Sequence, residues 1–292
     1  MVNFGINDTK LEDGTRVLVE SFDSLGDLVT HASGEGVNQF TKNNSVGTDW
    51  NGTRTFQDAV KLALNGWEEG TAKIEKYVSM FTGMLGSLLQ VDEYFYDVSG
   101  QDFDLDRVLI GEPEAWLNTE QVQVQAPALH TIKIVVNIMA SAAVSTSAIT
   151  MRGAAIAALV LLLEKARRNV ELEVICSSSA EWDGREVLIT SLTVKRAGES
   201  IDLSKLAFVL THPSMLRRFM FGCMENCSDK KLAKKISRGH GCPSDVCLDK
   251  GDIYCGRLLG YYGEQEAGNW IKENLEGQGI ELKGAVYENH TH

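Results

Sequence analysis

The chain has 292 residues, of which 43% are hydrophobic and 23% are charged. This balance is typical of a soluble globular protein and excludes a disordered, collagen-like or coiled-coil chain. The formal net charge of −12 argues against general binding to nucleic acids or anionic membranes, although a local basic patch can override it. The longest apolar run, 154–163, is about half of the ~20 residues that span a bilayer, so no membrane segment is expected. No secretory signal is visible at the N-terminus, and we expect a cytoplasmic protein.

Residues 1–120 are expected to form a mostly helical segment that packs on the core. A strand is predicted at 16–22 and helices at 56–65 and 71–89, with Thr55 and Asp58 at the spacing of a capping box. Four aspartates then follow at positions 97, 102, 104 and 106 without the order of a calcium-binding loop. Turns and helix caps that face solvent are the favoured interpretation of these aspartates.

Residues 121–220 are predicted to form an α/β core. A β-branched run at 131–138 is typical of a buried strand, and the apolar segment 151–169 is typical of a buried helix. A second strand is predicted at 170–176 and a third at 187–195. The order strand, helix, strand predicts a parallel unit whose helix lies between a sheet and other helices.

Residues 221–292 are predicted to form an extension that contains a cysteine cluster, with helices at 252–261 and 268–275 and a strand at 280–287. Cysteine thiolates and an imidazole can hold zinc in a closed tetrahedral site that supports local folding. The spacing lacks the C-x2-C pair of a zinc ribbon, so free thiols are the alternative. The candidate ligands for a structural zinc are Cys223, Cys227, His240, Cys242, Cys247 and Cys255.

A basic segment at 230–238 stands out in this acidic chain. It can dock phosphate or an acidic partner, or it can be the solvated face of an amphipathic helix with Leu232 and Ile236 on the other side. Its cationic residues are Lys230, Lys231, Lys234, Lys235 and Arg238.

Three blocks of the sequence together resemble an uncharacterised family of bacteriophage-encoded proteins. They are WNGTRTFQDAVKLALNGWEEG at 50–70, YDVSGQDFDLDRVLIGEPEAW at 96–116, and the stretch from IKIVVNI at 132 to FMF at 221. The resemblance implies a protein of the host cytoplasm or of the virion, and it implies no particular activity.

The core also resembles a von Willebrand factor A-like domain, a doubly wound sheet whose members often bind partner proteins through a metal after the first strand. That metal site needs an Asp-x-Ser-x-Ser turn, whereas the matching turn here has Asn137 and Met139, and only Ser141 remains. The resemblance therefore implies the fold without the metal. Ligands of open α/β sheets bind at the carboxyl ends of the strands. The polar residues expected at this rim of the sheet are Asn137, Ser141, Ser145 and Thr146. They can bind a small polar ligand, or their side chains can form hydrogen bonds with the backbone of their own loops.

The sequence contains no nucleotide-binding loop, nucleophile elbow or H-E-x-x-H motif, and a non-enzyme is favoured. The resemblance, together with a rim that lacks catalytic and metal-binding groups, predicts a phage protein that acts by protein–protein association. It would be a virion component or a binder of a host or phage factor, and it can form a homo-oligomer. The alternative is a nucleic-acid-handling protein that uses the segment 230–238 and a zinc module.

Overall fold

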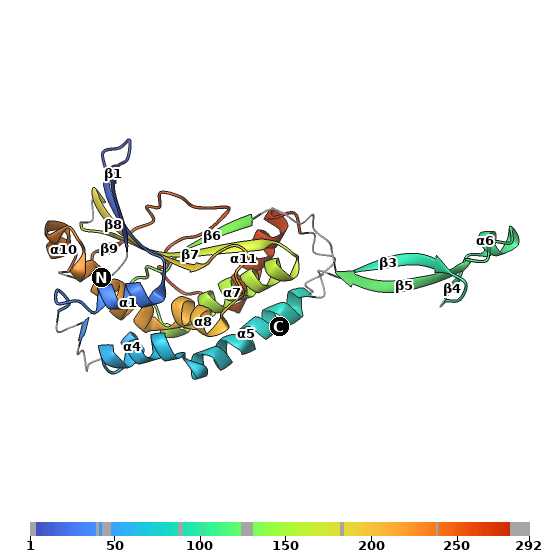
Figure 1. The fold of residues 1–292 in the computed structure, drawn as a ribbon, viewed down its shortest axis with the longest axis horizontal. Helices are drawn as coiled ribbons and strands as arrows, with labels where there is room; N and C mark the ends of the chain where they lie inside the picture. The colour runs from blue at the N-terminus through green and yellow to red at the C-terminus, as the bar shows by residue number, and fades with distance from the viewer. Residues whose placement is uncertain are drawn as a thin grey trace, which may run out of the picture.

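The computed structural model describes residues 4–38, 41–42, 48–86, 90–100, 102–123, 131–181, 184–237 and 239–280. They form a body, in which helices pack on a sheet of seven strands, and a thin arm that extends from one end of it (Figure 1). The predicted α/β class is confirmed.

The sheet of the body is mixed. Strand β6 is parallel to both of its neighbours, β7 and β10, whereas β7 is antiparallel to β8 and β9. The doubly wound, von Willebrand A-like form of the core stays an expectation. In spatial order the strands are β1 (Gly5–Lys10), β2 (Arg16–Phe22), β8 (Glu186–Lys195), β7 (Asn169–Ser179), β6 (Thr131–Asn137) and β10 (Ile253–Cys255), with β9 (Cys242–Pro243) also beside β7.

Helix α7 (Thr146–Lys165) connects β6 to β7, so the predicted parallel unit is confirmed. It packs on α5 (Glu68–Gly86), α8 (Leu203–Thr211) and α11 (Glu264–Gly277). In the described part of the chain it is the one helix long and apolar enough to cross a membrane. Most of α7 is buried inside the body, which is the state of a core helix of a globular protein.

The strands divide their side chains between two apolar clusters because successive residues point to opposite faces. Ile134 and Val174 belong to the large cluster that the helices cover. Val135 and Ile175 belong to a smaller cluster on the other face, with Val246 and Tyr254 packed against it. The helices and the large core therefore lie on one side of the sheet, and loop segments cover the small cluster.

Two of the N-terminal helices begin at capping residues, and the predicted capping box is confirmed. Ser24 caps α1 (Leu25–Ala32), and Thr55 and Asp58 form both bonds of a capping box at α4 (Phe56–Asn65). The short helix α3 (Thr48–Asn51) precedes α4.

Residues 90–123 differ from the predicted helical segment. They form the arm, a ribbon of β3 (Gln90–Asp97) and β5 (Trp116–Gln123) with the short strand β4 (Asp102–Phe103) and helix α6 (Leu105–Leu109) at its end. The sequence analysis expected neither of the two long strands. Within the described residues, the arm's strands pair with one another and with no strand of the body.

Of the two helices predicted in the C-terminal extension, one is confirmed and the other is wrong. The helix at 268–275 is confirmed as part of α11, whereas 253–255 forms β10 instead of a helix, because its backbone pairs with β6 at the edge of the sheet. Before them come a π-helix (Met215–Met220), α9 (Phe221–Asn226) and α10 (Lys230–Ile236). The strand predicted at 280–287 lies outside the described residues, apart from its first residue.

His31 on α1 is mostly covered and lies beside a buried carboxylate. Its ring packs on Phe4 and Phe22 at centroid distances of 4.8 and 5.2 Å, and its Nε2 is 3.7 Å from Oε2 of the fully buried Glu20. Burial lowers the pKa of His31 below its ordinary value of 6.5, against the attraction of Glu20.

The free energy of unfolding is therefore expected to decrease as the pH falls through about 6.5. The unfolded chain takes up a proton on His31 at the ordinary pKa, whereas the folded protein does so only at lower pH, so acid favours the unfolded state. Urea unfolding of the wild type and of His31→Gln at about pH 7.5 and about pH 5.5 measures this effect. The variant should lose less stability than the wild type, and equal losses would exclude His31 as the source.

Candidate functional site

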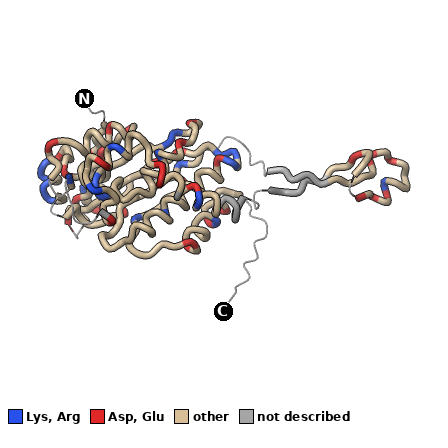
Figure 2. Tube along the Cα trace, turned by 90° about the horizontal axis from the view of Figure 1, so that it is seen from below, with Lys and Arg blue, Asp and Glu red and all other residues tan. Residues whose placement is uncertain are grey.

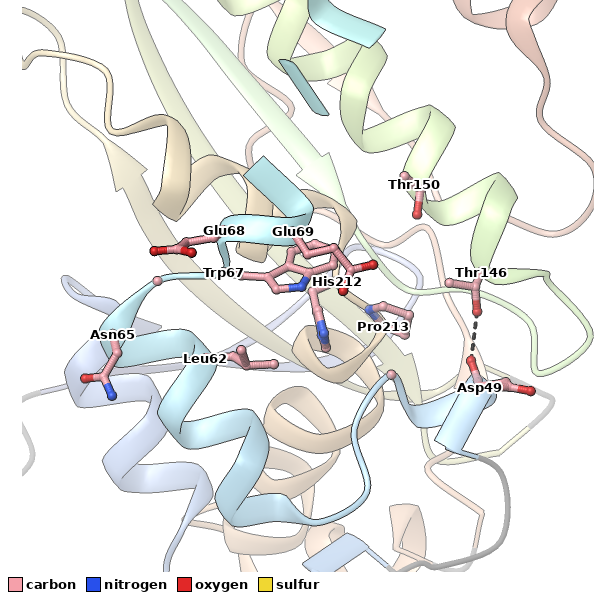
Figure 3. A pocket seen from close by; sticks show the side chains of 12 residues that line it. Asp49, Leu62, Asn65, Trp67, Glu68, Glu69, Thr146, Thr150, His212 and Pro213 are labelled. Atoms are coloured by element: carbon pink, nitrogen blue, oxygen red, sulfur yellow. Dashed lines mark hydrogen bonds between the residues drawn. The ribbon is translucent and has the colours of Figure 1, made fainter. Parts of the chain in front are cut away.

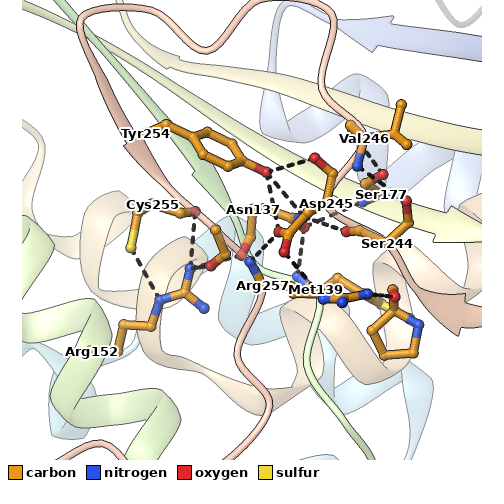
Figure 4. A network of polar contacts seen from close by, with 12 residues as sticks. Asn137, Met139, Arg152, Ser177, Ser244, Asp245, Val246, Tyr254, Cys255 and Arg257 are labelled. Atoms are coloured by element: carbon orange, nitrogen blue, oxygen red, sulfur yellow. Dashed lines mark hydrogen bonds and ion pairs between the residues drawn. The ribbon is translucent and has the colours of Figure 1, made fainter.

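The rim residue Asn137 at the end of β6 is buried and fully engaged (Figure 4). Its Nδ2 donates to the carbonyl oxygen of Ser244 at 2.8 Å, and its Oδ1 accepts from the amides of Met139 at 3.1 Å and Ser177 at 3.4 Å. Its second Nδ2 hydrogen points to the Tyr254 hydroxyl at 3.5 Å, so all four hydrogen-bonding positions of the amide have partners inside the protein and the side chain fixes the loop around it. Asn137 therefore has a structural role where the resemblance placed a metal ligand.

Arg152, which the sequence analysis did not single out, holds the same edge together. This buried side chain of α7 donates to the carbonyl oxygens of Asn137 at 2.8 Å, Cys255 at 3.2 Å and Gly256 at 2.5 Å (Figure 4). It ties α7 to the ends of β6 and β10. A lone arginine inside an apolar helix was the available sequence signal, because such a cation needs buried acceptors.

The other rim residues also bond to the backbone. The amide of Ser141 donates to the carbonyl oxygen of Leu258 at 2.9 Å. Ser145 is the N-cap of α7, and Thr146 donates to the carbonyl oxygen of Asp49 at 2.9 Å. These bonds agree with the interpretation that the loops satisfy their own backbone, although Ser141 and Thr146 also line two surface hollows.

The first hollow lies at the carboxyl edge of β6, and we call it the edge groove. It has a volume of about 350 Å³ and is mostly apolar. Its lining contains two basic side chains, Arg217 and His240, and no carboxylate. Its members are Trp50, Met139, Ala140, Ser141, Ala142, Leu216, Arg217, Phe221, Gly239, His240, Gly241 and Pro243.

Both basic side chains of the edge groove are held in place. Arg217 donates to the carbonyl oxygens of Trp50 at 2.6 Å and Val144 at 2.9 Å, and burial lowers its pKa to about 10. The ring of His240 stacks on Phe221 at 3.8 Å, and its Nε2 lies 2.9 Å from Oε1 of Glu225. The groove is thus a preformed surface.

The second hollow, the acidic cleft, has a volume of about 720 Å³ and lies between α4, α5 and the start of α7 (Figure 3). Asp49, Glu68 and Glu69 give it three carboxylates. His212 lies at its floor, where Trp67 meets the imidazole edge-on at 4.4 Å and Nδ1 accepts from the amide of Ser214 at 3.1 Å. The remaining lining residues are Gly52, Leu62, Asn65, Gly66, Thr146, Thr150 and Pro213. Its charge disfavours an acidic ligand.

The candidate zinc ligands do not converge. Cys223 and Cys227 are buried near α9, where burial raises the pKa of Cys227 to about 12, and Cys255 accepts a bond from Arg152 Nε at 3.3 Å. Cys242 lies in β9, and Cys247 contacts the carbonyl oxygen of Asp249. Among the described residues, no three His, Cys, Asp or Glu side chains are grouped to hold a metal ion. The zinc module finds no support in this arrangement.

The basic segment forms α10, as the amphipathic interpretation predicts. Leu232 and Ile236 are buried, and Asp229 caps the helix. Lys230 donates to the carbonyl oxygen of Cys227 at 3.2 Å, and Lys235 forms an ion pair with Glu186. Lys231 and Lys234 are exposed. Arg238 lies outside the described residues.

The end of the arm, residues 95–100 and 102–116, is called the tip, and it is ordered by its own contacts. Phe103 meets Trp116 edge-on at 5.8 Å, and the Arg107 guanidinium lies 3.7 Å from the centre of the Tyr96 ring. Asp104 caps α6 and accepts from the Tyr96 hydroxyl at 2.9 Å, a bond that lowers the pKa of the carboxyl group. The prediction that these aspartates act as caps is confirmed for Asp104.

The tip is both apolar and acidic. Leu109 and Ile110 are each 74% exposed. Of the exposed large hydrophobic side chains in the described part of the chain, nine lie on the arm and five on the much larger body. The segment 95–116 carries six carboxylates and one arginine (Figure 2). The arm residues with exposed apolar side chains are Phe95, Tyr96, Val98, Phe103, Leu105, Val108, Leu109, Ile110 and Trp116.

Comparison with known proteins places the chain in a family. A family model described as a domain of unknown function (DUF7192) matches residues 6–281. The chain belongs to this family. No curated protein and no solved structure matches it. The DUF7192 match includes the arm, the edge groove and the acidic cleft.

Proposed function

We propose that this DUF7192 protein works by binding another protein through the tip of its arm. The exposed apolar side chains of the tip carry the proposal. Large contiguous apolar surfaces are rare on monomeric proteins and mark sites of association. Burying an exposed leucine or isoleucine contributes about 1.5–3 kcal/mol, so Leu109 and Ile110 together can anchor a complex.

The form of the arm supports the same function. A two-stranded ribbon is marginally stable by itself in water. Among the described residues β3 and β5 pair only with each other and with β4, so they gain from a surface that covers them. The carboxylates of the tip disfavour anionic lipids and nucleic acids as that surface. A protein surface with an apolar centre and basic side chains fits both properties of the tip.

The resemblance noted from the sequence adds the setting. On that resemblance we expect the partner to be a virion subunit or a host or phage factor. The alternative, a nucleic-acid-handling protein, has weaker support, because α10 is short and two of its lysines are held by neighbouring groups.

Site-specific photo-crosslinking in cells that make the protein tests the proposal. A photoreactive residue at position 109 should crosslink to one defined protein, whereas the same residue at Leu64, which is 57% exposed on α4 of the body, should not. The crosslinked protein is then purified and titrated with the wild type, with the tip variant Leu109→Asp/Ile110→Asp and with the control Leu64→Asp.

The tip variant should raise the dissociation constant at least a hundredfold. This follows because it removes two apolar anchors worth about 1.5–3 kcal/mol each, and about 1.4 kcal/mol corresponds to a factor of ten. Leu64→Asp should bind as the wild type does. Equal crosslinking from positions 109 and 64, or equal affinity of the tip variant and the wild type, would refute the proposal.

A further inference from the structure

We infer that the partner is a second copy of this chain, whose edge groove receives the tip. The inference rests on the proposed function and adds the identity of the partner. Three observations support it: the tip and the edge groove lie on opposite sides of the molecule, both are apolar, and they differ in charge.

The first property is position. The arm follows Gly86 at the end of α5 and precedes Thr131 at the start of β6, whereas Ser141 and Ala142 of the edge groove follow the end of β6. The tip and the groove are thus on opposite sides of the body, as the places of the arm and of β9 show in Figure 1. A tip that extends away from its own groove can enter only the groove of another copy.

The second property is apolar character. The groove has an opening of about 350 Å³ that is lined by Trp50 and by the largely buried Leu216 and Phe221. The tip presents the exposed Leu109 and Ile110. Aliphatic anchors that enter a preformed apolar hollow are the usual centre of a protein interface. The acidic cleft is larger, but its walls carry three carboxylates.

The third property is charge. The six carboxylates and one arginine of the tip give a strong negative field. The lining of the edge groove contains Arg217 and also His240, which pairs with the buried Glu225. The end of α10 adjoins the groove through the bond from the Gly241 amide to the Ile236 carbonyl oxygen at 3.1 Å, and this helix adds the exposed Lys231 and Lys234. Figure 2 shows mostly acidic residues on the tip, and basic residues together with acidic ones at the far end of the body. The field of the tip therefore favours the groove and opposes the acidic cleft.

This arrangement makes the contact heterologous. Each copy has one tip and one groove, so a pair joined by a single contact still offers a free tip and a free groove. Copies add head to tail until a ring closes or a filament grows. Assembly should weaken as salt is added, because the charges around the groove and the tip are screened.

Sedimentation velocity over a wide range of protein concentration tests the inference. Four proteins are compared: the wild type, the tip variant Leu109→Asp/Ile110→Asp, the groove variant Ala142→Glu and the control Ala143→Glu. Ala142 and Ala143 are both exposed, but only Ala142 lines the groove. A midpoint of thermal unfolding equal to that of the wild type verifies that each variant is folded.

The wild type and Ala143→Glu should assemble into a closed ring, of which a pair with two reciprocal contacts is the smallest, or into longer species. The tip and groove variants should each stay monomeric. An equimolar mixture of these two variants should form a one-to-one dimer and nothing larger. In that mixture only one competent tip and one competent groove remain for each pair of chains.

Three results would overturn the inference: a monomeric wild type, assembly of Ala142→Glu like the wild type, or a mixture that stays monomeric. The wild type can prove monomeric while the tip variant no longer binds the protein that crosslinks to position 109. In that case the proposed function stands, and the inference that the partner is a second copy is wrong. If the tip variant changes neither measurement, both are wrong.

Discussion

Replacing Gly153 with alanine should destabilise the protein by about 2–3 kcal/mol, even though alanine is the better helix former by about 1 kcal/mol. Gly153 lies on α7 where that helix meets the end of α8. A Cβ atom at this position would be 2.3 Å from Cγ2 of Thr211 and 2.4 Å from the carbonyl oxygen of Leu210. The backbone of α8 cannot rotate away as a side chain can, so the helices must separate and lose packing.

Gly268→Ala in α11 is the matched control. A Cβ atom there would meet nothing within 4 Å, so this substitution should stabilise the protein by about 1 kcal/mol through helix propensity alone. Urea unfolding measures both effects, provided that the slope of the free energy of unfolding against urea concentration stays the same in the variants. If Gly153→Ala proves as stable as Gly268→Ala, the close approach of α7 and α8 is wrong.

The second large effect is expected at Arg218, whose substitution by methionine should cost about 3–5 kcal/mol of stability. This side chain is fully buried. It donates to Thr53 Oγ1 at 2.8 Å and to the carbonyl oxygens of Thr53 at 2.8 Å and Thr41 at 2.7 Å. Burial lowers its pKa, and methionine would leave these acceptors buried without a donor.

Two further variants separate hydrogen bonding from charge. Arg218→Lys keeps the charge but loses the planar fork, so its stability should lie between those of the wild type and Arg218→Met. Arg54→Met removes a nearby exposed arginine and should change stability by less than about 0.5 kcal/mol. Equal unfolding midpoints for Arg218→Met and Arg54→Met would contradict the role of Arg218.

Local patterns of the sequence determined the type of most elements in the body. The β-branched run before α7, the apolar helix itself and the next strand are each recognisable alone, because their periodicity and caps lie within a few residues. The strand–helix–strand order then implied the parallel pairing of β6 and β7. The capping box of Thr55 and Asp58 was predictable for the same reason.

The candidate site was predicted less well, because each of its properties depends on distant parts of the chain. Cysteines that are close in sequence lie on different elements, such as α9, β9 and β10. Their spacing therefore suggested a zinc site that the described residues do not assemble. Asn137 was assigned to a ligand rim, whereas its partners at Ser177 and Ser244 show that it closes a loop. Arg152 and Arg217 became recognisable only with their acceptors in view.

The sequence by itself determined the α/β class, the helix caps, the acidic charge of the segment 95–116 and the basic charge of α10, because composition and local spacing suffice for these. Only the tertiary structure decided that 90–123 leaves the body as a ribbon, that Leu109 and Ile110 face solvent, and that the edge groove lies on the opposite side. Exposure and relative position follow from which segments cover one another, and such contacts join residues far apart in the chain.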